Sequence, residues 1–368
     1  MENYFCIPLL WYTMPLFICV DFSLGTSMNH LSLLFSLLLI SCKNDNIDTS
    51  ISDTSDILEP NSPVWSVSLE YDERGAFLSA WSTSSEDIWV VGGFPDSGVI
   101  LRGNKNTGWE NFVLPSETPL LNWIHGTSES DVWVGGLYGT LLHWNGAEWE
   151  DHSQDVLEAV WGIFVQDNEV VAVGGESKWG GTQGFVWKFN GTEWSSISLP
   201  SQVADVNNLF KVTYDGEAYW MVGAAGTLLY GQIDNLEAIP TGFATDLITV
   251  SPSPRSETKV LVVGGRGTGI YFWGENGVME EKEQSIAGLN GVFVASKHTL
   301  MVGEMGYGLL FDELHTQATE PIAMTRDILH ATTAVEYENY TTFYAVGGNL
   351  AAADDNYHGV ILTLTVEP

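Results

Sequence analysis

The feature that most constrains this chain is an apolar stretch ending in Val-Gly that returns seven times. Its clearest copy is Asp131-Val-Trp-Val-Gly-Gly136, which is followed by a glycine turn, a second apolar strand and an Asn-Gly turn. The valine before the glycine is, in successive copies, Val91, Val134, Val173, Val222, Val263, Val302 and Val346. These positions are 39 to 49 residues apart, about 42 on average. Self-similarity at this period, with several short strands per copy, predicts a radial array of β-sheets.

The array also has a predicted way to close. The seventh repeat ends after Gly359–Leu364 and lacks an outermost strand, whereas Val64–Leu69 stands alone before the first repeat and resembles the outer strand Glu193–Leu199. Pairing of the two ends would complete the last sheet and remove exposed strand edges. We therefore expect an all-β fold, a seven-bladed β-propeller of four-stranded antiparallel blades closed by an N-terminal strand. Six or eight blades are the alternatives, because repeats four to six are degenerate.

The repeated glycines and tryptophans have structural explanations. A glycine pair lets two backbones approach closely at a tight turn near a crowded axis. A phosphate-binding loop would instead open a helix, and nothing helical follows any of the pairs. One outer-strand position is tryptophan in four repeats, and we expect packing between blades there, with sugar platforms as the alternative. These residues are Trp65, Trp109, Trp149 and Trp194.

We expect an export signal near the N-terminus. Leu31–Ser41 is an apolar run of 11 residues, too short for a stable transmembrane helix but long enough for the core of a secretory signal. The sequence Leu39-Ile-Ser-Cys42 resembles the bacterial lipobox, in which the cysteine is lipidated. That resemblance implies lipidation of Cys42 and an exported protein anchored to the bacterial cell envelope, and Lys43 points to the outer membrane. The missing positive charge before Lys43 departs from the pattern.

Four segments follow from these features. Residues 1–27 are expected to be a non-native extension, 28–41 a lipoprotein signal peptide, 42–62 a disordered acidic tether and 63–368 the propeller. A membrane span at Tyr4–Val20 is the alternative for the first segment. The cysteines are Cys6, Cys19 and Cys42, so no disulfide can form within the repeats.

Charge excludes one class of partner. The chain has 47 acidic and 13 basic residues, a formal net charge of −34. Nucleic acid binding depends on clustered Lys and Arg, so nucleic acid is not an expected partner. The charge is interpreted as a solubility device, and attraction for cations or a basic partner is the alternative.

The repeat layout resembles known families. A glycine pair, an aromatic strand and an outer-strand tryptophan are similar to kelch-type repeats. The layout around Asp131–Trp149 looks still more like propeller lipoproteins of bacteria, and it is similar to photosystem-assembly-factor and BNR-type propellers. The resemblance covers Pro63–Pro368 and implies the fold. It does not imply an activity, because propellers include enzymes, scaffolds and lectins.

Functional residues are expected where the repeat is irregular. The sequence contains no catalytic motif and no Cys/His metal cluster, so neither an enzyme nor a bound metal cofactor is predicted. Three loops exceed the minimal turn: Phe94–Ser97, Glu176–Gly184 and Asn349–Tyr357. These loops, together with the adjoining His358, supply the candidate ligand-binding residues: Asp96, Glu176, Asp354, Asp355 and His358. Clustered carboxylates would suit Ca²⁺, and solvated acidic loops are the alternative.

A second candidate set is expected to face the axial channel, with packed core residues as the alternative: Trp81, His125, Trp161 and His330. Together these features predict a non-enzymatic, monomeric, lipid-anchored propeller that binds a protein or glycan through its loops at the cell envelope. A carbohydrate-active propeller enzyme and a scaffold for assembly of a membrane complex are the alternatives.

Overall fold

The structure is a computed structural model. It describes residues 63–84, 87–256, 259–280, 282–312, 318–321, 323–350 and 357–367, together with two strands near the N-terminus. Those two strands belong to a separate unit, Met1–Ile57, in which β1 (Phe5–Leu9) pairs antiparallel with β2 (Leu16–Val20). The second unit, Leu58–Pro368, contains all the repeats. Cys42 and the predicted tether up to residue 62 lie outside the described residues. The described residues include no helix with the length and apolar character needed to cross a membrane.

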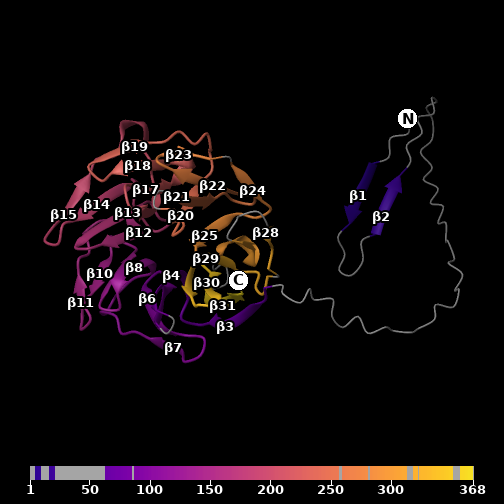
Figure 1. The fold of residues 1–368 in the computed structure, drawn as a ribbon, viewed down its shortest axis with the longest axis horizontal. Helices are drawn as coiled ribbons and strands as arrows, with labels where there is room; N and C mark the ends of the chain where they lie inside the picture. The colour runs from indigo at the N-terminus through magenta and orange to yellow at the C-terminus, as the bar shows by residue number, and fades with distance from the viewer. Residues whose placement is uncertain are drawn as a thin grey trace, which may run out of the picture. The chain divides into compact units, whose positions relative to one another are not determined.

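The second unit is a ring of seven antiparallel sheets, six formed by consecutive strands and the seventh completed by the N-terminal strand β3 (Figure 1). Each of the first four blades contains four strands that follow one another from the centre outward. Blade 1 is β4 (Ala76–Ser84), β5 (Asp87–Phe94), β6 (Ser97–Asn104) and β7 (Gly108–Asn111); blade 2 is β8 (Leu121–Ser128), β9 (Asp131–Gly136), β10 (Leu141–Trp144) and β11 (Trp149–Asp151); blade 3 is β12 (Ala159–Gln166), β13 (Glu169–Gly175), β14 (Phe185–Phe189) and β15 (Trp194–Ile197); blade 4 is β16 (Leu209–Tyr214), β17 (Tyr219–Gly223), β18 (Leu228–Gln232) and β19 (Asn235–Ala238).

The last three blades follow the same order with two variations. Blade 5 is β20 (Leu247–Pro252), β21 (Lys259–Gly264), β22 (Gly269–Glu275) and an outer strand split into β23 (Val278–Met279) and β24 (Glu283–Ser285); blade 6 is β25 (Leu289–Val294), β26 (Thr299–Gly303), β27 (Gly308–Phe311) and β28 (Ala318–Thr319); blade 7 is β29 (Ile328–Glu336), β30 (Thr341–Asn349), β31 (His358–Val366) and β3 (Trp65–Asp72). Three short 3₁₀ turns complete the elements: η1 (Ser201–Val203), η2 (Ala224–Gly226) and η3 (Glu304–Gly306).

The N-terminal strand closes the ring as expected. β3 pairs antiparallel with β31, with Trp65 opposite Leu364 and Asp72 opposite Gly359 (Figure 1). The hydroxyl oxygens of Ser66 and Thr363 lie 2.6 Å apart across this pair. The seven-bladed, four-stranded architecture is therefore confirmed, and six or eight blades are not found.

The core lies between neighbouring sheets. The second strand of each blade is buried on both faces, as in β9, where Val132, Trp133 and Val134 are at most 3% exposed. Such a strand has a continuous apolar run instead of an alternating pattern, because a blade covers each of its faces. This is why the sequence before each Val-Gly step is almost wholly apolar.

The glycine of the Val-Gly step lies where two strands of a blade meet closely in six blades, and in blade 2 Gly135 instead faces the side chains of Val160 and Ile163 in blade 3. A Cβ built on Gly92 would be 1.9 Å from the carbonyl oxygen of Ala76, and one built on Gly303 would be 1.9 Å from that of Gly288. Both glycines lie near the end of a second strand, beside the start of the inner strand. The glycine pairs are thus explained by close backbone approach, as predicted.

The four outer-strand tryptophans pack against the preceding blade, which confirms the prediction of inter-blade packing. The Trp109 indole donates to Ser68 Oγ at 2.9 Å in blade 7, and the Trp149 indole donates to the Val113 carbonyl at 3.0 Å beside blade 1. Trp194 of blade 3 meets Trp133 of blade 2 edge to face at 5.9 Å. Trp65 is buried among residues of blades 6 and 7.

Every inner strand contains one β-bulge near its start. The ladder between the first and second strands skips one residue in each of the seven blades: Leu78, Asn122, Trp161, Phe210, Ile248, Asn290 and His330. A bulge leaves the extra residue unpaired and changes the direction of its side chain. Trp161 and His330, two of the predicted channel residues, occupy this position.

Candidate functional site

A pocket of about 500 Å³ lies at one end of the central channel, and we call it the mouth pocket. It is lined by residues of blades 3 and 7, which are not neighbours in the ring, so it spans the centre. Its lining residues are Trp161, Lys178, Trp179, Arg326, Asp327, Ile328, His330, Gly348, Asn349 and Leu350. Two of the three irregular loops identified in the sequence therefore meet at this pocket.

Direct contacts join these two loops. Lys178 Nζ donates to the Leu350 carbonyl oxygen at 3.3 Å and lies 4.4 Å from the centre of the Trp179 ring. Trp161, Trp179 and Leu350 pack together against an apolar cluster that includes Leu120. The pocket thus combines an apolar wall with two exposed cations, Lys178 and Arg326.

The residues predicted to bind a ligand are not all gathered there. Asp96 is exposed in the β5–β6 turn, and Glu176 accepts a hydrogen bond of 2.7 Å from Asn207. His358 is only 7% exposed and its Nε2 lies 3.0 Å from the Asp327 carboxylate, which places it in the interior. Asp354 and Asp355 lie outside the described residues, so the expected Ca²⁺ site stays a prediction. The loops of blades 1 and 7 do adjoin, because the rings of Phe94 and Tyr357 meet edge to face at 5.5 Å.

The four predicted channel residues all belong to inner strands. Trp81 lies in β4, His125 in β8, Trp161 in β12 and His330 in β29. The rings of Trp81 and His125 lie 6.2 Å apart, and His125 Nδ1 accepts a hydrogen bond of 3.1 Å from the Val165 amide. Burial lowers the pKa of His125 to about 4.

Burial, together with the nearby Lys211, also lowers the pKa of His330 to about 4, and the buried His330 Nε2 has no hydrogen-bond partner among the described residues. Lys211, on the inner strand β16, is a further group that was not among the predicted residues. Its Nζ donates to the Trp161 carbonyl at 2.6 Å, and burial lowers its pKa to about 7.

A second, larger pocket of about 720 Å³ opens between blades 2 and 3 at the opposite ends of the strands, and we call it the blade 2–3 pocket. It is bordered by the β8–β9, β12–β13 and β14–β15 turns, and its polar lining includes Asp131, His143, Asn145, Glu150 and His152. Trp133 forms its apolar base, with its ring stacked 4.4 Å from that of His143.

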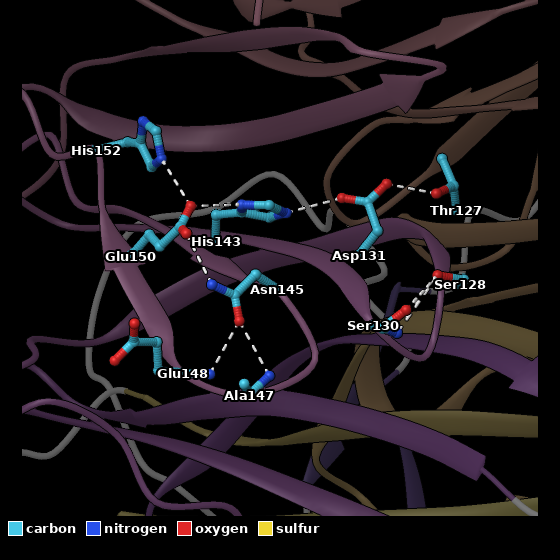
Figure 2. A network of polar contacts seen from close by, with 10 residues as sticks. All are labelled: Thr127, Ser128, Ser130, Asp131, His143, Asn145, Ala147, Glu148, Glu150 and His152. Atoms are coloured by element: carbon cyan, nitrogen blue, oxygen red, sulfur yellow. Dashed lines mark hydrogen bonds and ion pairs between the residues drawn. The ribbon is translucent and has the colours of Figure 1, made fainter. Parts of the chain in front are cut away.

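Figure 2 shows the polar side chains of this pocket connected in one network. His143 Nε2 lies 2.8 Å from Asp131, and His143 Nδ1 lies 3.2 Å from Glu150 Oε2. His152 Nε2 approaches the same Glu150 oxygen at 3.7 Å. The other Glu150 oxygen accepts a hydrogen bond of 2.7 Å from Asn145, whose own amide oxygen accepts the backbone N–H groups of the Asn-Gly turn.

The electrostatics of this network follow from its contacts. Burial alone would lower the pKa of His143, but hydrogen bonds with Asp131 and Glu150 outweigh it and raise that pKa. Burial and the adjacent His143 lower the pKa of His152. The hydrogen bonds from Asn145 and His143 lower the pKa of Glu150.

Sequence reasoning did not find this cluster. His143, Glu150 and His152 follow the spacing of no familiar metal motif. The one feature of the sequence that indicates the cluster is the Asn145-Gly146 turn, because a tight hairpin there places His143 opposite Glu150. His152 follows two residues later, on the same face of the strand as Glu150.

No protein-family model matches this chain, and no curated protein matches it in sequence. Solved structures do resemble it. The WD40 β-propeller domain of Doa1 superimposes with a TM-score of 0.58 at 10% identity, covering 83% of this chain and 97% of that one. YCF48 bound to D1 peptide gives 0.59 at 12% identity, covering 84% and 98%. YCF48 from Cyanidioschyzon merolae gives 0.58 at 12% identity, covering 82% and 98%. At these identities the likeness establishes the seven-bladed propeller fold and nothing narrower.

Proposed function

We propose that this propeller is a non-enzymatic binding protein that holds a peptide segment of a protein partner at the mouth pocket. The observation that carries the proposal is the convergence of two irregular loops, from blades 3 and 7, on one apolar and cationic pocket at the channel end. Function on repeat scaffolds generally lies in such loops.

The chemistry of the mouth pocket suits a peptide. Trp161, Trp179 and Leu350 offer an apolar surface for one or two side chains, and tryptophan is prominent among residues that dominate binding energy. Lys178 and Arg326 would attract an acidic side chain or a carboxyl terminus. The YCF48 structure that resembles this chain was solved with a peptide, which shows that a propeller of this shape can hold one.

The pocket is poorly suited to glycoside hydrolysis. That reaction requires two carboxyl groups about 5–9.5 Å apart. Asp327 is the one carboxylate among the lining residues described here, and it is paired with His358. At the mouth pocket a binding role is therefore preferred over the carbohydrate-active alternative.

The proposal places the propeller at the bacterial cell envelope, held by a lipid on Cys42. Its support is the sequence Leu39-Ile-Ser-Cys42 after an apolar run. Mass spectrometry of the mature N-terminus tests this part. A lipid-modified Cys42 as first residue is expected, and an intact Met1 would refute it.

Peptide binding can be tested with a phage-displayed library of random peptides. We expect selection on the wild-type full chain to enrich peptides with an apolar residue and an acidic group. These peptides should bind the double variant Trp179→Ala, Lys178→Glu at least tenfold more weakly. This corresponds to a loss of about 1.4 kcal/mol of binding free energy. Asp167→Ala, in the blade 2–3 pocket, is the matched control and should bind them normally. Enriched peptides that bind all three proteins equally would reject the mouth pocket as the site.

A further inference from the structure

Two positions that hold arginine and phenylalanine in blade 1 hold histidine in blade 2: Arg102 corresponds to His143, and Phe112 corresponds to His152. The hairpins of the two blades have the same register, with Arg102 opposite Trp89 and Glu110 in blade 1, and His143 opposite Trp133 and Glu150 in blade 2. Two residues after the glutamate, Phe112 donates its amide to Ile100 at 2.8 Å. His152 likewise donates its amide to Leu141 at 2.9 Å.

In blade 1, arginine and phenylalanine make the same packing and ion-pair contacts at these two positions. Arg102 forms an ion pair with Asp87, as His143 does with Asp131. Phe112 packs on the buried Trp89 at 4.9 Å, and His152 packs on Trp133 at 4.8 Å. Arginine and phenylalanine therefore meet the needs of the fold, and those needs do not explain two imidazoles facing one carboxylate.

The geometry points to a metal site: we propose that His143, Glu150 and His152 bind a divalent transition-metal ion of the Zn²⁺ type. Zn²⁺ takes histidine nitrogen and carboxylate oxygen at about 2.0–2.2 Å, so ligand atoms of a tetrahedral site are about 3.3 Å apart. The distances from Glu150 Oε2 are 3.2 Å to His143 Nδ1 and 3.7 Å to His152 Nε2. All three ligand atoms lie within 4.8 Å of one another, so small side-chain rotations bring them around one ion.

The surroundings of the cluster are those of a supported metal site. A metal-binding histidine usually gives its second ring nitrogen to a carboxylate, which fixes its orientation. Asp131 holds His143 Nε2 at 2.8 Å and leaves Nδ1 turned toward Glu150 (Figure 2). Asn145 binds the outer Glu150 oxygen at 2.7 Å, which leaves the inner oxygen facing both histidines. Imidazole and carboxylate ligands together favour Zn²⁺ and similar ions over Ca²⁺ or Mg²⁺.

The fourth position of such a site opens into the blade 2–3 pocket. Three protein ligands with an open position are the arrangement that keeps a water or another group on the metal. The ligand side chains are 19% (His143), 46% (Glu150) and 22% (His152) exposed, so an ion can enter from solvent. The site lies at the opposite ends of the strands from the mouth pocket, so it stands independently of the proposed peptide binding.

Titration of the full chain with ZnCl₂ by isothermal calorimetry tests the site. Cys6, Cys19 and Cys42 are replaced by serine in every variant, because thiolates also bind Zn²⁺. We expect one ion per chain. The double variant His143→Arg, His152→Phe, which copies blade 1, should lose this ion and keep its melting temperature. Glu150→Gln should weaken binding at least about tenfold, and Asp131→Asn by about 10–100-fold.

Glu110→Gln, at the equivalent position of blade 1, is the matched control and should not change the affinity. If the double variant fails to fold, Co²⁺ bound to the unaltered site decides the matter. We expect the strong visible absorption that is typical of tetrahedral Co²⁺. X-ray absorption should show two imidazole ligands on the ion. The proposal is overturned if no ion binds, if the double variant binds with unchanged affinity, or if bound Co²⁺ has no histidine ligands.

Discussion

The ammonium nitrogen of Lys211 lies 4.0 Å from the centre of the Trp123 ring, inside the ring of blades. It forms no ion pair with any carboxylate among the described residues. The cation is held by the Trp123 ring and the Trp161 carbonyl, and these contacts do not offset its burial, since its pKa falls to about 7.

Lys211→Met should therefore stabilise the protein at pH 7, by about 1–3 kcal/mol. The folded-state pKa lies below the unfolded value, so the unfolded chain binds more protons between pH 7 and about 10.5 and stability rises with pH in that window. The variant lacks this rise, so its advantage should shrink by pH 10. Urea unfolding of both proteins at pH 7 and pH 10 measures this, and a destabilised variant at pH 7 would contradict it.

His125→Asn should make the protein less sensitive to acid. The pKa of His125 falls to about 4 through burial, and its Nδ1 must stay unprotonated to accept the Val165 amide. The unfolded chain takes up the proton first, so stability is complete above about pH 6.5 and is lost as pH falls toward 4, by up to about 3 kcal/mol. Asparagine offers an acceptor oxygen without this titration. Denaturant unfolding at pH 7 and 4.5 should show a smaller loss for the variant; equal losses would refute the assignment.

Trp65→Ala should weaken the closure of the ring. Trp65 is 3% exposed and packs against Leu300 and Leu310 of blade 6. Removing a buried tryptophan costs about 3–5 kcal/mol through lost contacts and the cavity left behind. Val64→Ala is the control, because Val64 is 66% exposed and should change stability by less than about 0.5 kcal/mol. Thermal unfolding compares the two, and similar melting temperatures would show that β3 contributes little.

Gly92→Ala should destabilise more than Gly108→Ala. A Cβ on Gly92 would be 1.9 Å from the Ala76 carbonyl oxygen, so the backbone of the inner strand must move. A Cβ on Gly108 meets no atom within 4 Å, and its φ of +86° adds a strain of about 1–2 kcal/mol. We expect a loss of more than about 3 kcal/mol for Gly92→Ala, measured by chemical unfolding. Equal losses would mean that the close approach at Gly92 costs no more than the torsional strain at Gly108.

The repeat made the fold predictable. Seven Val-Gly steps predicted the number of blades, and the isolated Val64–Leu69 segment predicted the closing strand. Both predictions were possible because each blade repeats the same order of strands, and this repeat is visible in the sequence. The outer-strand tryptophans were also interpreted correctly as packing residues. These features depend on the order of residues within one repeat, which a single sequence shows directly.

The sites were less predictable because they depend on which blades meet. The mouth pocket unites Trp179 with Leu350, which are far apart in sequence and belong to blades that are not neighbours. His143 and Glu150 face each other only through the register of one hairpin, and Lys211 lies on β16 directly after its bulge. His358 looked like a loop residue but begins β31 and pairs with Asp327. The spacing of residues along the sequence predicts none of these contacts.

The closing strand also has a consequence for synthesis. Ser66 and Thr363, which touch in blade 7, are separated by 297 positions in the chain. At about 5–20 residues per second, β3 leaves the ribosome roughly 15–60 s before its partner exists. During that interval six blades can form while β3 has no sheet to join. The last strand to be made is thus the one that turns an open arc into a ring, and nascent chains are exposed to mispairing until it arrives.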